Sequence, residues 1–306
     1  MPACSTPNFV IVTPAYNEAA YIDETIESVA KQTVRPICWL IVDDGSTDET
    51  PEKIRRAEER YPWVRGHRRT KDPAQSYFAS NVYALADGIA LLADMEYNFL
   101  AILDADMVLP EDYYEQIFAR FEREPALGAA SGVYLNRVGG QLQKVINDRR
   151  STPKAIQVFR RECFEQIGGY VPLKYGGEDT CSCIMARQHG WKSWSFPELQ
   201  AIHCRPTGMG GARGVIRARF RQGLCDYGVG SHPLFMLVKA LRRCLFEPPF
   251  LVGGTLRLAG YLWGCVRREP YQIPEEVVRF VRRDQLRRVF GLNRVPEENR
   301  VNWETA

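Results

Sequence analysis

The stretch Phe99-Leu100-Ala101-Ile102-Leu103-Asp104-Ala105-Asp106 places two carboxylates directly after an apolar run. A short apolar run of this kind is typical of a buried strand. Two earlier runs have the same form, since residues 9–13 end at Pro14 and residues 38–42 end at Asp43-Asp44-Gly45. The sequence therefore predicts three buried strands that each end in polar or turn-forming residues.

Amphipathic helices are predicted between these strands. Ile22 and Ile26 share one helical face after the first run, and a similar apolar stripe covers residues 78–92 before the third. Ser46, with Glu49 three residues later, predicts a capping box that opens another helix. Alternating strands and helices require a largely parallel sheet, in which ligands bind at the carboxyl ends of the strands.

The charges of the chain are unevenly distributed. Residues 1–202 carry 22 Lys and Arg against 28 Asp and Glu, a net charge of −6, whereas residues 203–290 carry 16 against 6, a net charge of +10. An acidic first part suits a metal-binding catalytic domain, and a basic part suits phosphates or an anionic surface.

The nine cysteines show no zinc-ligand spacing and no secretory leader precedes them, so we expect a cytoplasmic protein with reduced thiols.

Two acidic pairs are candidate site residues. Asp104 and Asp106 carry oxygens of the kind that a hard divalent cation prefers, and a diphosphate would supply further ligands. Gly176-Gly177-Glu178-Asp179 places two acids where a helix begins, after glycines that allow a close approach of backbone to ligand. The alternatives are an exposed acidic loop for the first pair and helix-dipole compensation for the second.

Three motifs occur in a fixed order along the first third of the chain. They are Thr13-Pro14-Ala15-Tyr16-Asn17-Glu18, Val42-Asp43-Asp44-Gly45-Ser46-Thr47-Asp48 and Leu103-Asp104-Ala105-Asp106. In this order and spacing they resemble family 2 glycosyltransferases, clearly over residues 9–107 and more loosely to about residue 205. The resemblance implies an α/β fold of the GT-A type, with a mostly parallel nucleotide-binding sheet flanked by helices.

Two domains follow from the motifs and from the change in composition. We expect a GT-A catalytic domain over residues 1–205 and a C-terminal extension of basic, amphipathic helices over residues 206–306. The absence of Gly-x-Gly-x-x-Gly after the first strand argues against a dinucleotide-binding dehydrogenase. The basic part interleaves its charges with aliphatic residues and offers few planar side chains, so we expect no nucleic-acid partner.

The resemblance implies a role for each residue that matches a motif. The first loop borders the base and ribose, the second motif hydrogen-bonds the base, and the third binds ribose, diphosphate and a divalent metal, Mn²⁺ or Mg²⁺. The metal would be held by Asp104 and Asp106. The donor-binding residues would be Pro14, Tyr16, Glu18, Asp43, Asp44 and Asp104.

Asp179 matches the residue that deprotonates the acceptor hydroxyl in similar enzymes, with Glu178 orienting the acceptor or the loop. Because a helix dipole lowers the pKa of a carboxyl group near the helix start, we expect this base to act by proximity more than by basicity. His203 lies where related enzymes place a metal or diphosphate ligand, although a lone histidine is as often structural.

Arg205, Arg221 and Gln222 are candidate diphosphate contacts in the basic part of the chain. The Gln-x-x-Arg-Trp motif of related processive enzymes is missing in the region of Arg221 and Gln222. A solvated basic face is therefore the alternative for these two residues.

These residues predict an inverting transfer of a sugar from a nucleoside-diphosphate donor to an acceptor that the sequence does not identify. Uridine diphosphate is the nucleotide that the resemblance favours, and surface polysaccharide or glycan synthesis is the process. Carbohydrate and lipid-linked acceptors both fit. The alternative is a non-catalytic scaffold of the same fold that binds nucleotide sugars.

A membrane contact is predicted for the basic part. Residues 248–266 are almost uncharged, but Arg257 falls near their centre, and an Arg at mid-bilayer is too costly for a spanning helix. We therefore expect helices that lie in the interface at the cytoplasmic face of the membrane, with basic residues towards anionic headgroups. The alternative is an ordinary subdomain that packs on the catalytic core.

Overall fold

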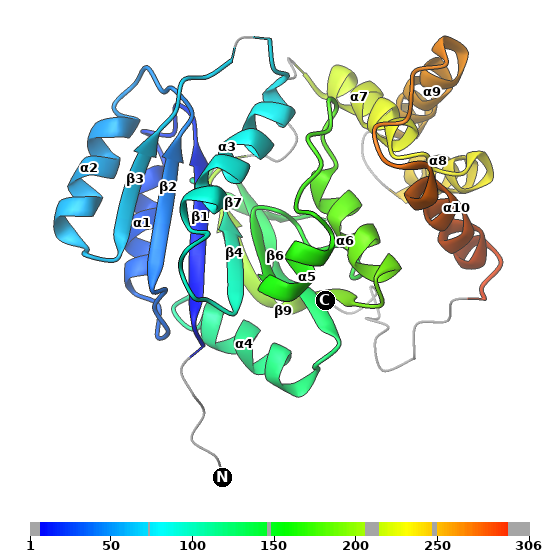
Figure 1. The fold of residues 1–306 in the computed structure, drawn as a ribbon. Coiled ribbons are helices and arrows are strands. Elements are labelled where there is room, and N and C mark those ends of the chain that lie inside the picture. Colours follow the sequence, from blue (N-terminus) through cyan, green and yellow to red (C-terminus); the bar gives the residue numbers. More distant parts are fainter. Residues whose placement is uncertain (1–6, 73, 146–147, 206–213, 247–249, 293–306) are drawn as a thin grey trace. The chain divides into compact units, whose positions relative to one another are not determined.

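The computed structural model describes residues 7–72, 74–145, 148–205, 214–246 and 250–292. The chain divides into two units, Met1–Ala212 and Arg213–Ala306, whose elements are labelled in Figure 1. The boundary predicted between residues 205 and 206 borders residues 206–213, which lie outside the described residues.

A mixed nine-stranded sheet forms the centre of the first unit (Figure 1). Its strands are β1 (Phe9–Ala15), β2 (Cys38–Asp43), β3 (Val64–Arg68), β4 (Phe99–Leu103), β5 (Met107–Val108), β6 (Leu127–Val138), β7 (Gln141–Lys144), β8 (Ile156–Arg160) and β9 (Lys192–His203). The strand order is β3-β2-β1-β4-β8-β6-β9-β5, with β7 paired to β6. The first four strands in this order run parallel, β8 is antiparallel to β4, and β6 runs parallel to β9.

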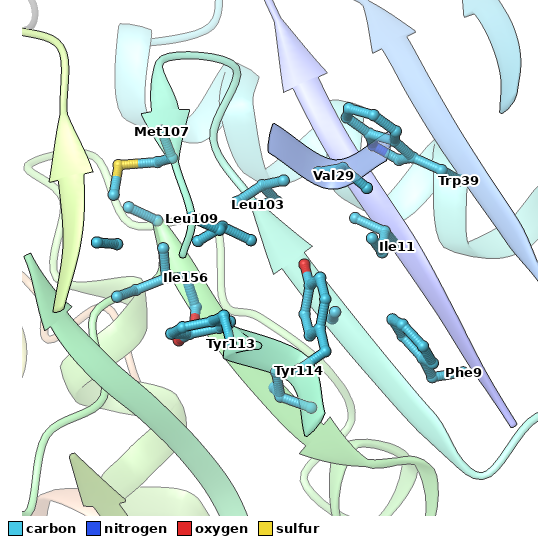
Figure 2. Packing of buried hydrophobic residues seen from close by; sticks show 14 of the residues in the cluster. Phe9, Ile11, Val29, Trp39, Leu103, Met107, Leu109, Tyr113, Tyr114 and Ile156 are labelled. Carbon is cyan, nitrogen blue, oxygen red and sulfur yellow. The ribbon is translucent and has the colours of Figure 1, made fainter. Parts of the chain in front are cut away.

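One face of the sheet packs against α1 (Ile22–Ala30), α2 (Thr50–Arg60) and α4 (Tyr113–Arg123). Phe9 on β1 and Tyr114 on α4, both labelled in Figure 2, belong to this core, and their ring centroids are 4.9 Å apart. Successive residues of a strand point to opposite faces, so Phe9 and its neighbour Val10 belong to different cores.

The opposite face packs against α3 (Tyr77–Leu91), α5 (Arg161–Gln166) and α6 (Glu178–Gln188). Val10 of β1 lies in this second core. Because both faces are covered, β1 reads as a continuous apolar run rather than as an alternating pattern. The loop that follows β1 therefore begins at a fully buried strand end.

The three predicted strands are confirmed as β1, β2 and β4, and the predicted parallel sheet is confirmed in the half that they build with β3. Strands β3, β5, β7 and β9 were not predicted. β3 is a short edge strand with three charged or His residues and one glycine. β9 contains Pro197, and its pairing with β6 is irregular between the Ser131–Ser195 and Val133–Gln200 pairs, as expected for a proline within a sheet.

The capping box predicted at Ser46 and Glu49 is wrong. Helix α2 begins at Thr50, and the Asp48 carboxylate accepts the Thr50 backbone N–H at 3.0 Å. The Ser46 hydroxyl instead accepts the Asn17 backbone N–H at 2.9 Å, so it joins the loops after β1 and β2. The Ser46 side chain thus makes a long-range contact between two loops instead of the local capping contact that the spacing of Ser46 and Glu49 suggested.

In the described residues of the second unit, the chain forms the helices α7 (Val215–Gly228), α8 (Pro233–Phe246), α9 (Val252–Arg267) and α10 (Glu275–Val289). Its small core includes Tyr227, Met236 and Tyr261. A Cβ atom on Gly260 would lie 2.0 Å from the Phe220 carbonyl oxygen. The glycines of this apolar segment therefore permit α7 and α9 to pack closely, as small residues do where helix backbones meet.

Arg257 points into the second unit. Its Nε and Nη2 atoms donate to the two carboxylate oxygens of buried Asp226, at 2.5 and 3.0 Å. Lys239 of α8 also binds Asp226, at 2.9 Å. Arg257 is the residue that argued against a membrane-spanning helix in the sequence, and its positive charge is balanced by Asp226 inside the second unit. Within the described part of the chain, no helix combines the length and the apolar character needed to cross a bilayer.

Candidate active site

A pocket lies at the carboxyl ends of β1, β2 and β4, where the sequence predicted convergence of the strand-end residues. Parallel strands end at the same edge of a sheet, and their following loops therefore meet. The pocket also draws residues from α3 and from the chain just after β9. Its lining residues are Pro14, Ala15, Tyr16, Glu18, Asp44, Lys71, Tyr77, Asn81, Asp104, Ala105 and Arg205.

Glu18 is buried and forms an ion pair with the half-buried Arg205 in this pocket. Burial raises the pKa of Glu18 to about 7, although the guanidinium of Arg205 opposes that rise. The backbone N–H of Glu18 donates to the Thr50 hydroxyl at 2.8 Å, which holds the loop. Within the described residues, the buried Oε2 atom of Glu18 has no hydrogen-bond partner, so it can still accept from a ligand hydroxyl.

Asp43 and Asp44 have different positions. Asp44 lines the pocket, where it binds Arg69 at 3.1 Å and accepts the Ser80 hydroxyl at 2.5 Å. Asp43 is not part of the pocket lining, and its carboxylate accepts the Ser46 backbone N–H at 2.8 Å. Asp43 therefore shapes the turn that presents Asp44.

Tyr16 borders the pocket with a half-exposed ring. The ammonium of Lys71 lies over that ring, 3.5 Å from its centroid, and reaches Asp44 at 3.5 Å. An exposed aromatic face beside a carboxylate suits a planar ring with hydrogen-bond donors on its edge. Neither Lys71 nor Arg69 was predicted, because a basic residue in a polar loop carries no spacing signal.

Strand pairing brings His203 to Asp106. Met107 of β5 pairs with His203 of β9, and this register places the imidazole Nε2 atom 2.9 Å from Asp106 Oδ2. The other ring nitrogen of His203 lies 3.1 Å from the side-chain oxygen of Asn136 on β6. Arg205 Nε also binds Asp106 Oδ2, at 2.5 Å. His203, for which the sequence showed no partner at ligand spacing, thus has a carboxylate partner.

The pair of Asp106 and His203 fits a divalent cation. Metal-bound histidines usually give their second N–H to an oxygen acceptor, and Asn136 offers one. Among the described residues, no group of three or more His, Cys, Asp and Glu could hold a metal by itself. Mg²⁺-type ions are commonly held by one or two carboxylates together with water and substrate phosphates, and a site with few protein ligands matches that pattern.

Asp106 is almost fully buried and ionised. Burial alone would raise its pKa, but the hydrogen bond with His203 and the charges of His203, Arg205 and Lys154 outweigh burial and lower it. Asp104 is more exposed and lines the pocket, with its Oδ1 atom 2.5 Å from the Lys154 ammonium. The two carboxylates therefore contact different partners.

Glu178 and Asp179 open helix α6 after two glycines with positive φ, Gly176 at 84° and Gly177 at 98°. Other residues rarely adopt this conformation. Burial raises the pKa of Glu178 to about 7 and also raises the pKa of Asp179. We expected the helix dipole to lower the pKa of Asp179, and that expectation is wrong because removal from water dominates.

Two predicted diphosphate contacts lie elsewhere in the chain. Arg221 and Gln222 belong to α7 of the second unit. Gln222 accepts from Arg219 at 3.2 Å and from Arg257 at 3.3 Å within that unit. Arg205 lines the pocket of the first unit, whereas Arg221 and Gln222 belong to the second unit, and their role as diphosphate contacts stays a prediction.

Known proteins resemble the chain in sequence and in fold. A validoxylamine A glucosyltransferase of Streptomyces hygroscopicus subsp. limoneus is 32% identical over 115 residues, which cover 37% of this chain and 23% of that protein. A poly-beta-1,6-N-acetyl-D-glucosamine synthase of Staphylococcus aureus (strain COL) is 28% identical over 117 residues, 38% of this chain and 26% of that protein. The chain thus matches only about a quarter of the length of each of these relatives.

The fold is similar to that of the mannosyltransferase PcManGT from Pyrobaculum calidifontis, solved in complex with GDP-Man and Mn²⁺. The two structures superpose with a TM-score of 0.61 at 17% identity, over 87% of this chain and 89% of the other. This likeness supports the predicted GT-A fold. The model of the family described as Glycosyl transferase family 2 matches residues 10–177, more than half of the chain, and the chain therefore belongs to glycosyl transferase family 2.

Proposed function

We propose that the protein transfers a sugar from a nucleoside-diphosphate donor to an acceptor hydroxyl, with inversion at the anomeric carbon. The observation that carries this proposal is the pocket at the strand ends, where Asp44, Glu18, Asp104 and Arg205 meet beside the Asp106–His203 pair. Family membership supports it. The curated relatives are a glucosyltransferase and a polysaccharide synthase, which fits a role in glycan synthesis.

The pocket offers complementary groups for each part of a nucleotide sugar. Asp44 would accept an N–H of the base above Tyr16, and Asp104 and the unpartnered Glu18 oxygen would accept ribose hydroxyls. The Arg205 guanidinium would bind the diphosphate, since its planar fork matches phosphate oxygens. We propose a uridine nucleotide, on the resemblance described above.

Asp106 and His203, with Asp104 close by, would hold Mn²⁺ or Mg²⁺ when it is bound. The ion would supply charge neutralisation for the leaving diphosphate. Asn136 would keep the His203 ring in a ligating orientation through its side-chain oxygen. Arg205, which touches Asp106 and Glu18, would add a second positive charge at the same place.

Transfer would be a single displacement. Asp179 would take the proton of the acceptor hydroxyl as its oxygen forms a bond to the anomeric carbon. The bond from that carbon to the diphosphate oxygen breaks at the same time, and the diphosphate leaves with the electron pair. Attack from the opposite face inverts the configuration, and Glu178 would orient the acceptor.

A thermal-shift panel tests donor binding. UDP-glucose, UDP-N-acetylglucosamine and GDP-mannose are each added with and without MnCl₂, because a ligand that binds only the folded state raises the unfolding temperature. We expect at least one donor to stabilise the protein in a Mn²⁺-dependent manner. The non-catalytic scaffold would show the same stabilisation but no release of nucleoside diphosphate.

Turnover is expected to rise with pH as the acidic pair at the start of α6 ionises. The proposed base must be ionised, and burial raises the pKa of Glu178 to about 7 and the pKa of Asp179 above its usual value. The ionised fraction of a carboxyl base grows as the pH rises through its pKa, so hydrolysis of a saturating donor should be slower at pH 6 than at pH 8. A flat profile between these pH values, with the protein folded throughout, would contradict a base in this pair.

We further propose that the protein binds the cytoplasmic face of a membrane and uses a lipid-linked acceptor there. Exposed apolar residues recur every three or four residues on α8, and a second set lies on α9. The basic residues of this part would attract anionic headgroups, each contributing on the order of 1 kcal/mol near the surface. The exposed residues of the α8 set are Leu234, Leu237, Val238, Leu241 and Leu245.

Flotation with liposomes tests this association. The full-length protein should float with vesicles of anionic phosphatidylglycerol and float less, but still detectably, at high salt, because salt screens the electrostatic part alone. Leu237→Ser combined with Leu241→Ser should remove the salt-resistant part. Leu91→Ser on α3, an exposed leucine of the first unit, serves as the matched control. Equal recovery of the double variant in the floated fraction would argue against the α8 surface.

A further inference from the structure

Lys154 lies between the two acidic pairs of the site. It immediately precedes Ala155, whose carbonyl oxygen accepts the Asp104 backbone N–H at 3.0 Å beside the β4–β8 pairing. Its side chain is largely buried, and its ammonium binds Asp104 Oδ1 at 2.5 Å. None of the motifs in the sequence includes this residue.

The same residue also contacts the second acidic pair. The backbone N–H of Lys154 donates a hydrogen bond to the Asp179 carboxylate. The ammonium interacts electrostatically with Glu178 and Asp179 and lowers the pKa of both, against the larger effect of burial. One residue therefore binds Asp104 through its side chain and Asp179 through its backbone.

A buried ammonium is costly unless carboxylates surround it. Asp104 supplies such a carboxylate, with its Oδ1 atom 2.5 Å from the Lys154 ammonium, and Glu178 and Asp179 add two further negative charges nearby. The charge is therefore retained. Without this charge, Asp104 would lose its partner, and the two acids at the start of α6 would lose the nearby positive charge that favours their ionised forms.

We infer that Lys154 is a positioning residue that couples the donor side of the site, at Asp104, to the proposed base Asp179. The inference rests on the proposed function. Because Asp104 faces the donor and Asp179 faces the acceptor, removal of the ammonium affects two separable steps. Donor affinity changes through Asp104, and the rate at saturating donor changes through Asp179.

Lys154→Met tests this coupling, since it keeps the length of the side chain and removes its charge. The dissociation constant of UDP with MnCl₂, measured by calorimetry, should rise about fivefold, and kcat for donor hydrolysis should fall at least about tenfold. Lys154→Arg should recover most of both. Lys53→Met, which breaks the Lys53–Asp23 ion pair outside the pocket, should leave both quantities within about twofold of the wild type.

A change in only one of the two quantities would overturn the coupling. A Lys154→Met protein that loses thermal stability alone, with UDP affinity and kcat unchanged, would make Lys154 a purely structural residue. If this variant does not fold, Lys154→Gln supplies the same two measurements. A wild-type protein that hydrolyses none of the nucleotide sugars would refute the proposed function itself, whereas an active wild type with an insensitive Lys154→Met variant would refute only this inference.

Discussion

Asp106→Asn is expected to reduce turnover of a nucleotide sugar by at least about 100-fold, the usual cost of removing one group that stabilises developing charge. Asp106 is the carboxylate at which His203 and Arg205 converge, so its charge is needed for the proposed metal and diphosphate site. Asn keeps the volume and one acceptor oxygen. Arg205 keeps Glu18 as an ionic partner, and we therefore expect the fold to persist.

Two measurements accompany this variant. Circular dichroism should match the wild type, and the Mn²⁺ concentration that gives half-maximal donor hydrolysis should rise. Asp112→Asn is the matched control, because Asp112 lies at the start of α4 outside the pocket and its carboxylate accepts a local hydrogen bond from Gln116 at 2.6 Å. Activity within a few-fold of the parent, with unchanged Mn²⁺ dependence, would remove Asp106 from the site.

Asp179→Asn is expected to lower transfer by roughly 100- to 10,000-fold, the range for loss of a general base. The amide cannot take a proton from the acceptor, but it preserves the shape of the loop. Donor affinity should stay close to the wild-type value, because Asp179 is not among the residues that line the donor pocket. Calorimetry with UDP and MnCl₂ separates this binding step from turnover.

Glu162→Gln tests the alternative role of Asp179. Glu162 is an acid in the first turn of α5, outside the pocket, and complements that helix dipole without any proposed chemistry. If Asp179 serves the helix dipole alone, both variants should lose a similar small amount of stability and retain activity. Loss of UDP affinity in Asp179→Asn would instead assign this residue to the nucleotide site.

The sequence predicted the strands that can be recognised from a short run of neighbouring apolar residues. Strands β1, β2 and β4 are buried on both faces, so each reads as an apolar run that ends at a turn. The edge strand β3 has no such run, because its side chains are only partly buried. β9 was missed because Pro197 and polar residues interrupt it, although it supplies His203 to the site.

The candidate site was predicted where residues follow strand ends and was missed where pairing brings distant residues together. Asp44 and Asp104 were found because they end buried runs. The contact between His203 and Asp106 depends on the β5–β9 register, and no spacing in the sequence records that register. Lys154 lies next to Asp104 through the β4–β8 pairing and shows no motif of its own.

Release of nucleoside diphosphate tests the central claim most directly. The purified protein is incubated with UDP-glucose, UDP-N-acetylglucosamine or GDP-mannose, with and without MnCl₂, and free UDP or GDP is measured over time. We predict Mn²⁺-dependent release from at least one donor, which chelation by EDTA stops and which Asp106→Asn and Asp179→Asn both suppress. Stabilisation by a donor without any release, or release that is equal in wild type and both variants, would contradict a glycosyltransferase that acts through this site.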